Sequence, residues 1–317
     1  FGLSSGLLYP PSCYASLNEL VELAKVVREG GGIYATHIRD EGDGLLEAIG
    51  EAIEVGRRSG APVQISHHKA SGRKNWGKVG LTLAMMEEAR SSGVEVACDV
   101  YPYTASSTSL SAILPKWAHD GGVDALLERL RDRDALRRIR DYVERREGEQ
   151  NGWESTVIAM VFTDENKPFE GKSLLEIARS TGRDPFDVVV DFLIEDRGAT
   201  QIVRFTMSEE DVERVLKDPF AAIGTDATTR APYGPLARGK PHPRGYGTFP
   251  RVLGRYVRER KTLALEEAVR KMTSLPASRL GILDRGRIAK GLYADLVLLN
   301  EAEVIDTASY ENPHNYP

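Results

Sequence analysis

Three short segments constrain the fold of this chain more than any other feature, because each is an apolar or β-branched run that ends in a side chain able to bind a metal ion. These side chains are His37, His67 and Asp226, and one helix-sized interval separates the first two. Parallel β/α barrels place their active-site residues in this way, at the carboxyl ends of the strands. The pattern therefore predicts an α/β fold with a metal site at one end of a parallel sheet.

The first third of the chain alternates between helix-like and strand-like patterns. Apolar residues recur at helical spacing in three stretches, which are 17–28, 45–57 and 81–90. A run of strand length follows each of them, at 33–38, 63–66 and 94–100. Three successive steps of this kind imply a parallel sheet with right-handed crossovers. The 317 residues suffice for a barrel of about 250 residues together with further segments.

The alternation of helix-like and strand-like patterns stops after the third of these strands. The connection to the strand that ends at Asp226 is far longer than one helix, so it contains an insertion. Ser173 followed by Glu176, and Asp184 followed by Pro185, are typical helix N-termini, so we expect a mainly helical insertion. The expected divisions are barrel strands and helices in 1–109, the insertion in 110–216, the last barrel strand and closing helices in 217–285, and a final segment in 286–317 with a strand at 294–299.

Composition and charge exclude several classes of partner. Lys and Arg number 42 against 47 Asp and Glu, and the two signs are interspersed, as in the stretch 123–146. A nucleic-acid partner requires a continuous basic surface, so we expect none and interpret this stretch as a solvated helix or helix pair. No apolar run approaches the length of a membrane span, so we expect no membrane partner. Cys13 and Cys98 are the two cysteines, which fits a reducing compartment, and we expect a cytoplasmic location.

Strand geometry predicts which side chains share the site, because alternate residues of a strand face opposite sides of the sheet. The resulting groups are His37 with Arg39, His67 with Lys69, and Asp99 with Tyr101 and Tyr103. Imidazole and carboxylate suit zinc, and an open coordination position lowers the pKa of a bound water to about 7. Cations and hydroxyls beside such a metal suit an anionic substrate or a developing oxyanion. The residues therefore favour a metal-dependent hydrolase.

Each assignment has a structural alternative. A histidine at a strand end is commonly held by hydrogen bonds without ligating a metal, and we interpret His68 as structural. Asp226 could instead cap a helix or occupy a turn. Lys69 and Arg39 could be surface charges at a strand end, and the two tyrosines could pack within a loop. Among the histidines in loops, His242 is the one placed to reach a pocket.

Five motifs give the chain a resemblance to a known family. In chain order they are GLSSGLLYP at 2–10, THIRDE at 36–41, ISHHK at 65–69, YPYTASS at 101–107 and PHPRGYGTFP at 241–250. Together they resemble the D-aminoacylase (N-acyl-D-amino-acid deacylase) family of the amidohydrolase superfamily. The segment KGLYADLV at 290–297 is similar to the return strand into the superfamily's small β-sandwich domain. The resemblance implies a (β/α)8 TIM-like barrel, here partial and containing the later strands, with the insertion between the seventh and eighth strands.

The resemblance also implies zinc chemistry. His37 would be the fifth-strand zinc ligand and His67 the sixth-strand ligand, with one or two Zn2+ ions bound. Asp226 would be the eighth-strand carboxylate, which contacts the metal, takes a proton from the metal-bound water and passes it to the leaving amine. Members of the family hydrolyse the amide bond of N-acyl-D-amino acids, giving a carboxylate and a free D-amino acid.

Four further positions match those that hold the substrate in the family. By the resemblance, Lys69, Tyr101, Ser107 and Tyr9 would bind the carboxylate and the carbonyl of a small N-acyl-D-amino acid. The motifs fix neither the side chain nor the acyl group that is accepted, and they are compatible with an oligomer.

The chain also departs from the family pattern. The first-strand His-x-His pair and the second-strand cysteine ligand are absent, and neither Cys13 nor Cys98 occupies the ligand position. Because the chain starts at Phe1, we expect it to be a portion of a longer deacylase.

Two alternative functions stay open. One is another superfamily hydrolase of cyclic amides or dipeptides, similar to dihydroorotase or hydantoinase, which would turn over ring amides. The other is a non-catalytic truncated barrel that has lost its metal.

Overall fold

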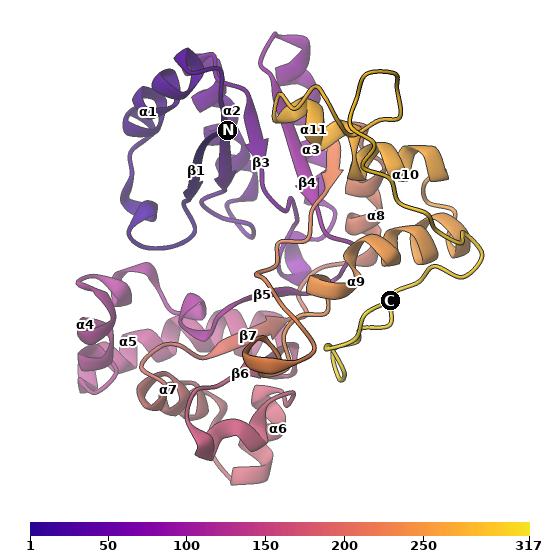
Figure 1. Ribbon diagram of the computed structural model, residues 1–317. Helices are drawn as coiled ribbons and strands as arrows, with labels where there is room; N and C mark the ends of the chain where they lie inside the picture. The colour runs from indigo at the N-terminus through magenta and orange to yellow at the C-terminus, as the bar shows by residue number, and fades with distance from the viewer.

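The computed structural model describes residues 1–317, and its largest feature is a five-stranded parallel sheet (Figure 1). In their order across the sheet, the strands are β1 (Gly2–Gly6), β2 (Ile33–His37), β3 (Val63–Ile65), β4 (Val96–Val100) and β8 (Ala221–Ile223). Every neighbouring pair is parallel, so the carboxyl ends of all five strands lie at one end of the sheet. The predicted α/β fold with a parallel sheet is confirmed.

Helices follow the strands, as the apolar spacing predicts. The helices that contribute to the same core as the sheet include α1 (Leu17–Glu29), α2 (Leu45–Ser59), α3 (Lys78–Ser91), α8 (Glu209–Lys217) and α10 (Leu265–Met272). Their ends have local causes. The Ser16 hydroxyl accepts a hydrogen bond from the backbone N–H of Glu19 at the start of α1. At the end of α2, Gly60 has a φ of 72°, in the left-handed region that glycine adopts without strain.

The long connection between β4 and β8 leaves the parallel sheet, because Cys98 of β4 pairs directly with Ala221 of β8. Figure 1 shows the connecting segment as a separate group of elements below the sheet. Its main helices are α4 (Gly122–Arg129), α5 (Arg133–Val143), a π-helix (Glu144–Asn151), α6 (Leu174–Thr181) and α7 (Pro185–Glu195). The predicted helix N-termini at Ser173 and Asp184 are confirmed by their side-chain hydrogen bonds to the first turn.

The connecting segment also takes part in an antiparallel sheet that the sequence analysis did not predict. Its strands, in spatial order, are β5 (Ser106–Ser109), β7 (Gln201–Arg204) and β6 (Thr156–Met160). The β5 strand contains only serine and threonine, so it lacks the alternation of apolar and polar residues that indicates a strand. The apolar runs in β6 and β7 are short, and periodicity alone cannot distinguish such runs from buried helix.

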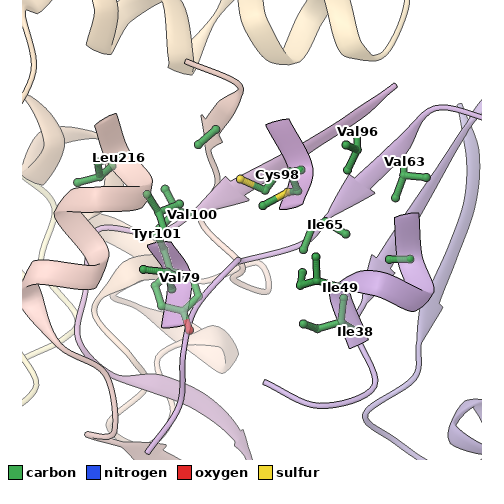
Figure 2. Close-up of a cluster of buried hydrophobic side chains, with 14 of the residues drawn as sticks. Ile38, Ile49, Val63, Ile65, Val79, Val96, Cys98, Val100, Tyr101 and Leu216 are labelled. Atoms are coloured by element: carbon green, nitrogen blue, oxygen red, sulfur yellow. The ribbon is translucent and has the colours of Figure 1, made fainter. Parts of the chain in front are cut away.

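Two hydrophobic cores stabilise these two groups of elements. One contains 37 buried residues from the parallel sheet and its helices, and the other contains 21 buried residues from the inserted segment. Figure 2 shows part of the first core, which includes Ile49 of α2 and Ile65 of β3. Because each core buries its own apolar surface, the inserted segment has a source of stability separate from that of the sheet.

Truncation of the first core is expected to destabilise the protein strongly. Ile49 is fully buried, so Ile49→Ala should lower the free energy of unfolding by about 2–5 kcal/mol through lost burial and the cavity left behind. Val26→Ala in α1 is the matched control, since Val26 is 67% exposed and should change this free energy by less than about 1 kcal/mol. Urea-induced unfolding of both variants measures the difference, and equal midpoints would contradict the assignment of Ile49 to the core.

The chain after β8 is irregular over most of 224–243, mainly helical from Arg244 to Arg279 and irregular again beyond it. The helices are α9 (Arg244–Arg251), a π-helix (Val252–Glu259), α10 and α11 (Ser274–Arg279). The predicted strand at 294–299 is wrong: no strand forms there, and Val297 and Leu298 are 86% and 101% exposed. An apolar run becomes a strand only where a neighbouring strand exchanges hydrogen bonds with it, and none lies beside this one. No helix in the structure combines the length and apolar character that a membrane crossing requires.

Candidate active site

A polar cavity of about 360 Å³ lies between the carboxyl ends of the parallel strands and the inserted segment. The segments that follow β3, β4 and β8 contribute His67, Lys69, Tyr101 and Asp226 to its wall, and β5 contributes Ser107. Only nine of its 35 lining residues are hydrophobic, which suits a small polar molecule. The structure therefore brings residues from three distant parts of the sequence to one cavity.

Two imidazoles face each other at the ends of neighbouring strands. Thr36 of β2 is paired with Ile65 of β3, so the residues that follow them lie side by side. His67 Nε2 lies 2.5 Å from His37 Nδ1, and the ring centroids are 4.3 Å apart. Burial lowers the pKa of His37, as does the nearby His67 ring, so its neutral form is favoured. Neutral imidazoles are the form in which histidine ligates a metal.

The second ring nitrogen of His67 lies within a buried charged group. Lys69 Nζ is 2.6 Å from His67 Nδ1 and 2.6 Å from Glu41 Oε1, and the same Glu41 oxygen is 3.0 Å from His67 Nδ1. Burial raises the pKa of Glu41, but the Lys69 ammonium and the His67 ring outweigh this effect, so the pKa lies well below its usual range. The carboxylate is therefore charged inside the protein, where it balances the Lys69 ammonium.

The backbone at His67 is held in an uncommon conformation. Its φ is 39°, and Asp226 has a φ of 46°, so two of the four non-glycine residues with positive φ belong to the candidate site. The Asp99 carboxylate accepts hydrogen bonds from the His67 backbone N–H (2.8 Å) and from Gln64 Nε2 (2.9 Å). Strained conformations of this kind persist only where surrounding contacts fix them, and they concentrate at functional sites.

Asp226 is held by a buried arginine. Its Oδ2 atom lies 2.8 Å from Arg244 Nη1, and the Arg244 side chain is 7% exposed, whereas that of Asp226 is 31% exposed. The Arg244 guanidinium also lies over the Tyr101 ring, 4.6 Å from its centroid. The carboxylate therefore reaches the cavity from a fixed direction, with one oxygen on Arg244.

The three hydroxyl residues expected to bind substrate all line the cavity, in different ways. Tyr101 is 1% exposed, and its hydroxyl lies 3.9 Å from the Met207 sulfur. The Tyr9 hydroxyl is 2.9 Å from Thr108 Oγ1, which ties the segment after β1 to β5. Ser107 is half-buried in β5. Together with Lys69, these residues give the cavity hydroxyl groups and one buried cation.

Of two further predictions about the cavity, one is confirmed and the other is wrong. Arg39 borders the cavity as strand parity predicts, with its guanidinium donating to Glu51 and to the backbone oxygens of Cys13 and Ala15. His242 does not line the cavity: its Nε2 pairs with the Ala105 oxygen at 2.9 Å and its ring packs on tyrosines. Strand parity predicts the side of the sheet but not the partner that a side chain finds there.

Two smaller predictions have clear outcomes. His68 is buried, and its Nε2 lies 2.8 Å from Thr82 Oγ1 of α3, so its structural role is confirmed. Tyr103 was grouped with Tyr101, but it does not line the cavity and packs its ring against His242 at a centroid distance of 4.9 Å.

The donor set fits a metal ion only in part. No group of three or more His, Cys, Asp or Glu side chains lies close enough to hold one, so the expected set of His37, His67 and Asp226 is not assembled as a cluster. The two imidazoles fit two ligand positions, because each turns a ring nitrogen toward the other and both nitrogens are of the type that zinc prefers. The residues present therefore fit part of a zinc site.

Comparison with known proteins places the chain in a family. The profile described as "Amidohydrolase family" matches residues 20–314, nearly the whole chain. The chain belongs to this family. The amidohydrolase fold accounts for the parallel sheet with helices, and for a cavity at the carboxyl ends of the strands.

Several relatives of this amidohydrolase act on acylated D-amino acids. D-aminoacylase from Alcaligenes xylosoxydans xylosoxydans is 36% identical over 315 residues, which cover 98% of this chain and 54% of the relative. The crystal structure of N-acyl-D-glutamate deacylase from Bordetella bronchiseptica, complexed with zinc and a phosphonate mimic of the reaction tetrahedral intermediate, is 32% identical with a TM-score of 0.78, over 99% of this chain and 56% of that one. A structure devoted to the binuclear metal centre of D-aminoacylase is 35% identical with a TM-score of 0.75, over the same shares.

These matches confirm the resemblance to N-acyl-D-amino-acid deacylases. The chain spans about half the length of the curated relatives that it matches.

Two residues of this amidohydrolase were not assigned from the sequence. Glu41 and Arg244 both lie in motifs that carry the family resemblance, but no role was given to either. Glu41 follows His37 by four residues, beyond the end of β2, and only the folded loop brings its carboxylate to His67 and Lys69. A charged residue shortly after a metal-capable residue at a strand end is the signal that could have found it.

Proposed function

We propose that the protein of which these residues form the active-site region hydrolyses the amide bond of N-acyl-D-amino acids, releasing a carboxylate and a free D-amino acid. The observation that carries the proposal is the pair of facing imidazoles at the ends of β2 and β3, with Lys69 against the second of them. It is also supported by relatives that are 36% and 32% identical to the chain, which are a D-aminoacylase and an N-acyl-D-glutamate deacylase.

Zinc is the proposed metal, with His37 and His67 as two of its ligands and one or two ions bound. When bound, zinc would lower the pKa of a water molecule and polarise the substrate carbonyl. The buried surroundings of His67 and the neutral form of His37 suit ligation of a cation. Further ligands are required beyond these two imidazoles, since zinc sites of this kind use at least three protein ligands.

Asp226 is the proposed proton carrier. It takes a proton from the attacking water and gives it to the amine as the carbon–nitrogen bond breaks, so that the new carbon–oxygen bond and the N–H bond replace the two that are lost. Arg244 holds one carboxylate oxygen, which leaves the other free to face the cavity. The direction of Asp226 is thus fixed before the substrate arrives.

Lys69, Tyr101, Ser107 and Tyr9 are the proposed substrate-binding residues. They line one cavity and supply a cation and three hydroxyls, which suit the carboxylate and the carbonyl of an acylated amino acid. The parallel sheet in this proposal is the later part of a (β/α)8 barrel, and residues 110–216 are an insertion with its own core that forms part of the cavity wall.

The proposed function is tested by matched substrates. The full natural polypeptide, loaded with zinc, is incubated with N-acetyl-D-amino acids of acidic, polar and apolar side chain, with their L-enantiomers, and with a ring amide such as hydantoin. Release of free amine from the D-series alone is expected. Turnover of the ring amide alone, or of none of the compounds by a zinc-loaded protein, would overturn the proposal.

Replacement of the buried lysine is expected to impair substrate binding. Lys69→Met keeps the length of the side chain and removes the charge, so KM should rise and kcat/KM should fall by about 10–100-fold, the worth of a charge-assisted hydrogen bond. Lys74→Met is the control, because this lysine is half-exposed and pairs with Asp43. Steady-state kinetics on one D-substrate measures both, and an unchanged kcat/KM would remove Lys69 from the site.

A further inference from the structure

The position of the proton on the His67 ring affects the zinc site of the proposed function, and what we infer from it rests on that function. A neutral imidazole carries one proton, on Nδ1 or on Nε2. His67 Nε2 faces His37 Nδ1, and His67 Nδ1 faces both Lys69 and Glu41. The position of this proton therefore decides which neighbours His67 can bond.

Lys69 requires one position of the proton. An ammonium only donates hydrogen bonds, so its contact with His67 Nδ1 at 2.6 Å needs a lone pair on that nitrogen. The ring proton then lies on Nε2 and points toward His37 Nδ1. In this form His67 Nε2 would have no lone pair to offer to a metal.

Glu41 favours the other position. An ionised carboxylate only accepts hydrogen bonds, so Glu41 Oε1, which lies 3.0 Å from His67 Nδ1, can bond that nitrogen only when the nitrogen carries the proton. The Nε2 lone pair is then free on the side of His37, which is the form in which His67 can ligate a metal. The two neighbours of Nδ1 thus select opposite tautomers.

We propose that Glu41 is a positioning residue that selects the metal-ligating tautomer of His67 against the competing hydrogen bond from Lys69. One carboxylate oxygen, Oε1, has two roles. It accepts a hydrogen bond from the Nδ1–H group in this tautomer, and it gives the Lys69 ammonium another partner, 2.6 Å away. When the ring proton moves to Nδ1, one N–H of Lys69 is released toward the cavity that it lines. Metal binding and the availability of a substrate-binding cation are therefore coupled through Glu41.

The loop that carries Glu41 is fixed well enough for this role. The Glu41 backbone oxygen accepts a hydrogen bond from the Ser71 N–H at 2.7 Å, which ties it to the segment after Lys69. On the other side, the Asp40 carboxylate accepts from the Gly42 N–H at 2.7 Å. The Glu41 side chain is 13% exposed and that of Lys69 is 4% exposed, so neither charge can exchange its partner for water without a large cost.

Zinc affinity tests the proposal without relying on turnover. Competition with a chromophoric chelator gives the zinc Kd of the full natural polypeptide and its variants. Glu41→Ala is expected to weaken binding by about 10–100-fold, as loss of a residue that orients a ligand does. Glu41→Gln keeps an acceptor oxygen and should lose less. Asp43→Ala is the matched control, since this carboxylate lies on the same loop, is 56% exposed and pairs with Lys74.

A double variant separates tautomer selection from a general structural effect. If Lys69 competes for the Nδ1 lone pair, then Lys69→Met in the Glu41→Ala background should restore most of the lost zinc affinity. A merely structural role for Glu41 predicts no recovery, because the second change removes one more buried contact. The 15N chemical shifts of the His67 ring give an independent readout, since Nδ1 should carry the proton in the zinc-loaded wild-type protein.

The outcomes of the zinc-affinity measurements can be distinguished from those of the substrate assays that test the proposed function. Unchanged zinc affinity in Glu41→Ala, or a loss that Lys69→Met does not reverse, overturns the inference even if the protein hydrolyses N-acyl-D-amino acids. Recovery in the double variant supports it even if the substrate assays fail. A wild-type protein that binds no zinc overturns both. If Glu41→Ala fails to fold, the zinc affinities of Glu41→Gln and of the Glu41→Gln/Lys69→Met double variant are compared in the same way.

Discussion

Asp226→Asn is expected to lower kcat by about 10²–10⁴-fold, the contribution typical of a general acid–base group. The amide has nearly the same shape as the carboxylate but cannot take a proton from water and return it to the leaving amine. Its oxygen can still lie against the Arg244 guanidinium, whose Nη1 is 2.8 Å from Asp226 Oδ2, so the local geometry should persist. The loss should therefore appear in kcat, with a smaller change in KM.

The measurement pairs kinetics with metal analysis. The Asp226→Asn protein should retain the zinc for which His37 and His67 are the proposed ligands, and its kcat should be low for every D-substrate. Asp295→Asn is the control, because this exposed residue pairs with Arg285 in the irregular C-terminal segment. Near-normal turnover in Asp226→Asn would exclude the proposed proton transfer.

His67→Ala is expected to remove both zinc and activity. His67 is 7% exposed and lies between His37 and the Glu41–Lys69 pair, so no neighbouring side chain can take its place without moving. Loss of a ligand from a catalytic zinc site should reduce the zinc per chain to a small fraction of the wild-type content and lower kcat/KM by at least about 10²-fold.

Elemental analysis after dialysis against a weak chelator gives the zinc content. His119→Ala serves as the control, since His119 borders the same cavity but its Nε2 is paired with the Ser111 oxygen. Circular dichroism shows whether both variants remain folded. Stoichiometric zinc in folded His67→Ala would place the metal site elsewhere in the protein.

Much of the parallel sheet could be predicted from local sequence. The amphipathic stretches that became α1 and α2 are long and periodic, and glycine precedes the apolar runs that became the strands after α1, α2 and α3. The segments that the sequence did not indicate have no such pattern. The serine-rich β5 strand forms because β7 supplies its hydrogen bonds, and the apolar run at 294–299 remains irregular because no strand supplies them.

The candidate site could be predicted in part. His67 and Lys69 lie two residues apart after β3, and the structure places both at the cavity. Arg39 obeys the same parity relative to His37, but Glu51 of α2 and two backbone oxygens capture its guanidinium. Position along a strand is a local property, whereas the partner of a charge depends on which distant segment packs beside it.

The separation of the two hydrophobic cores has a consequence for the evolution of substrate selectivity. His37 and His67, the proposed zinc ligands, lie at the ends of strands that the first core supports, whereas the second core supports elements that form the rest of the cavity wall. Substitutions that reshape the outer wall can therefore accumulate in the inserted segment while the folding energy of the sheet stays nearly constant. Descendants of one ancestral catalyst could diverge in the compounds they accept and still share the same chemistry.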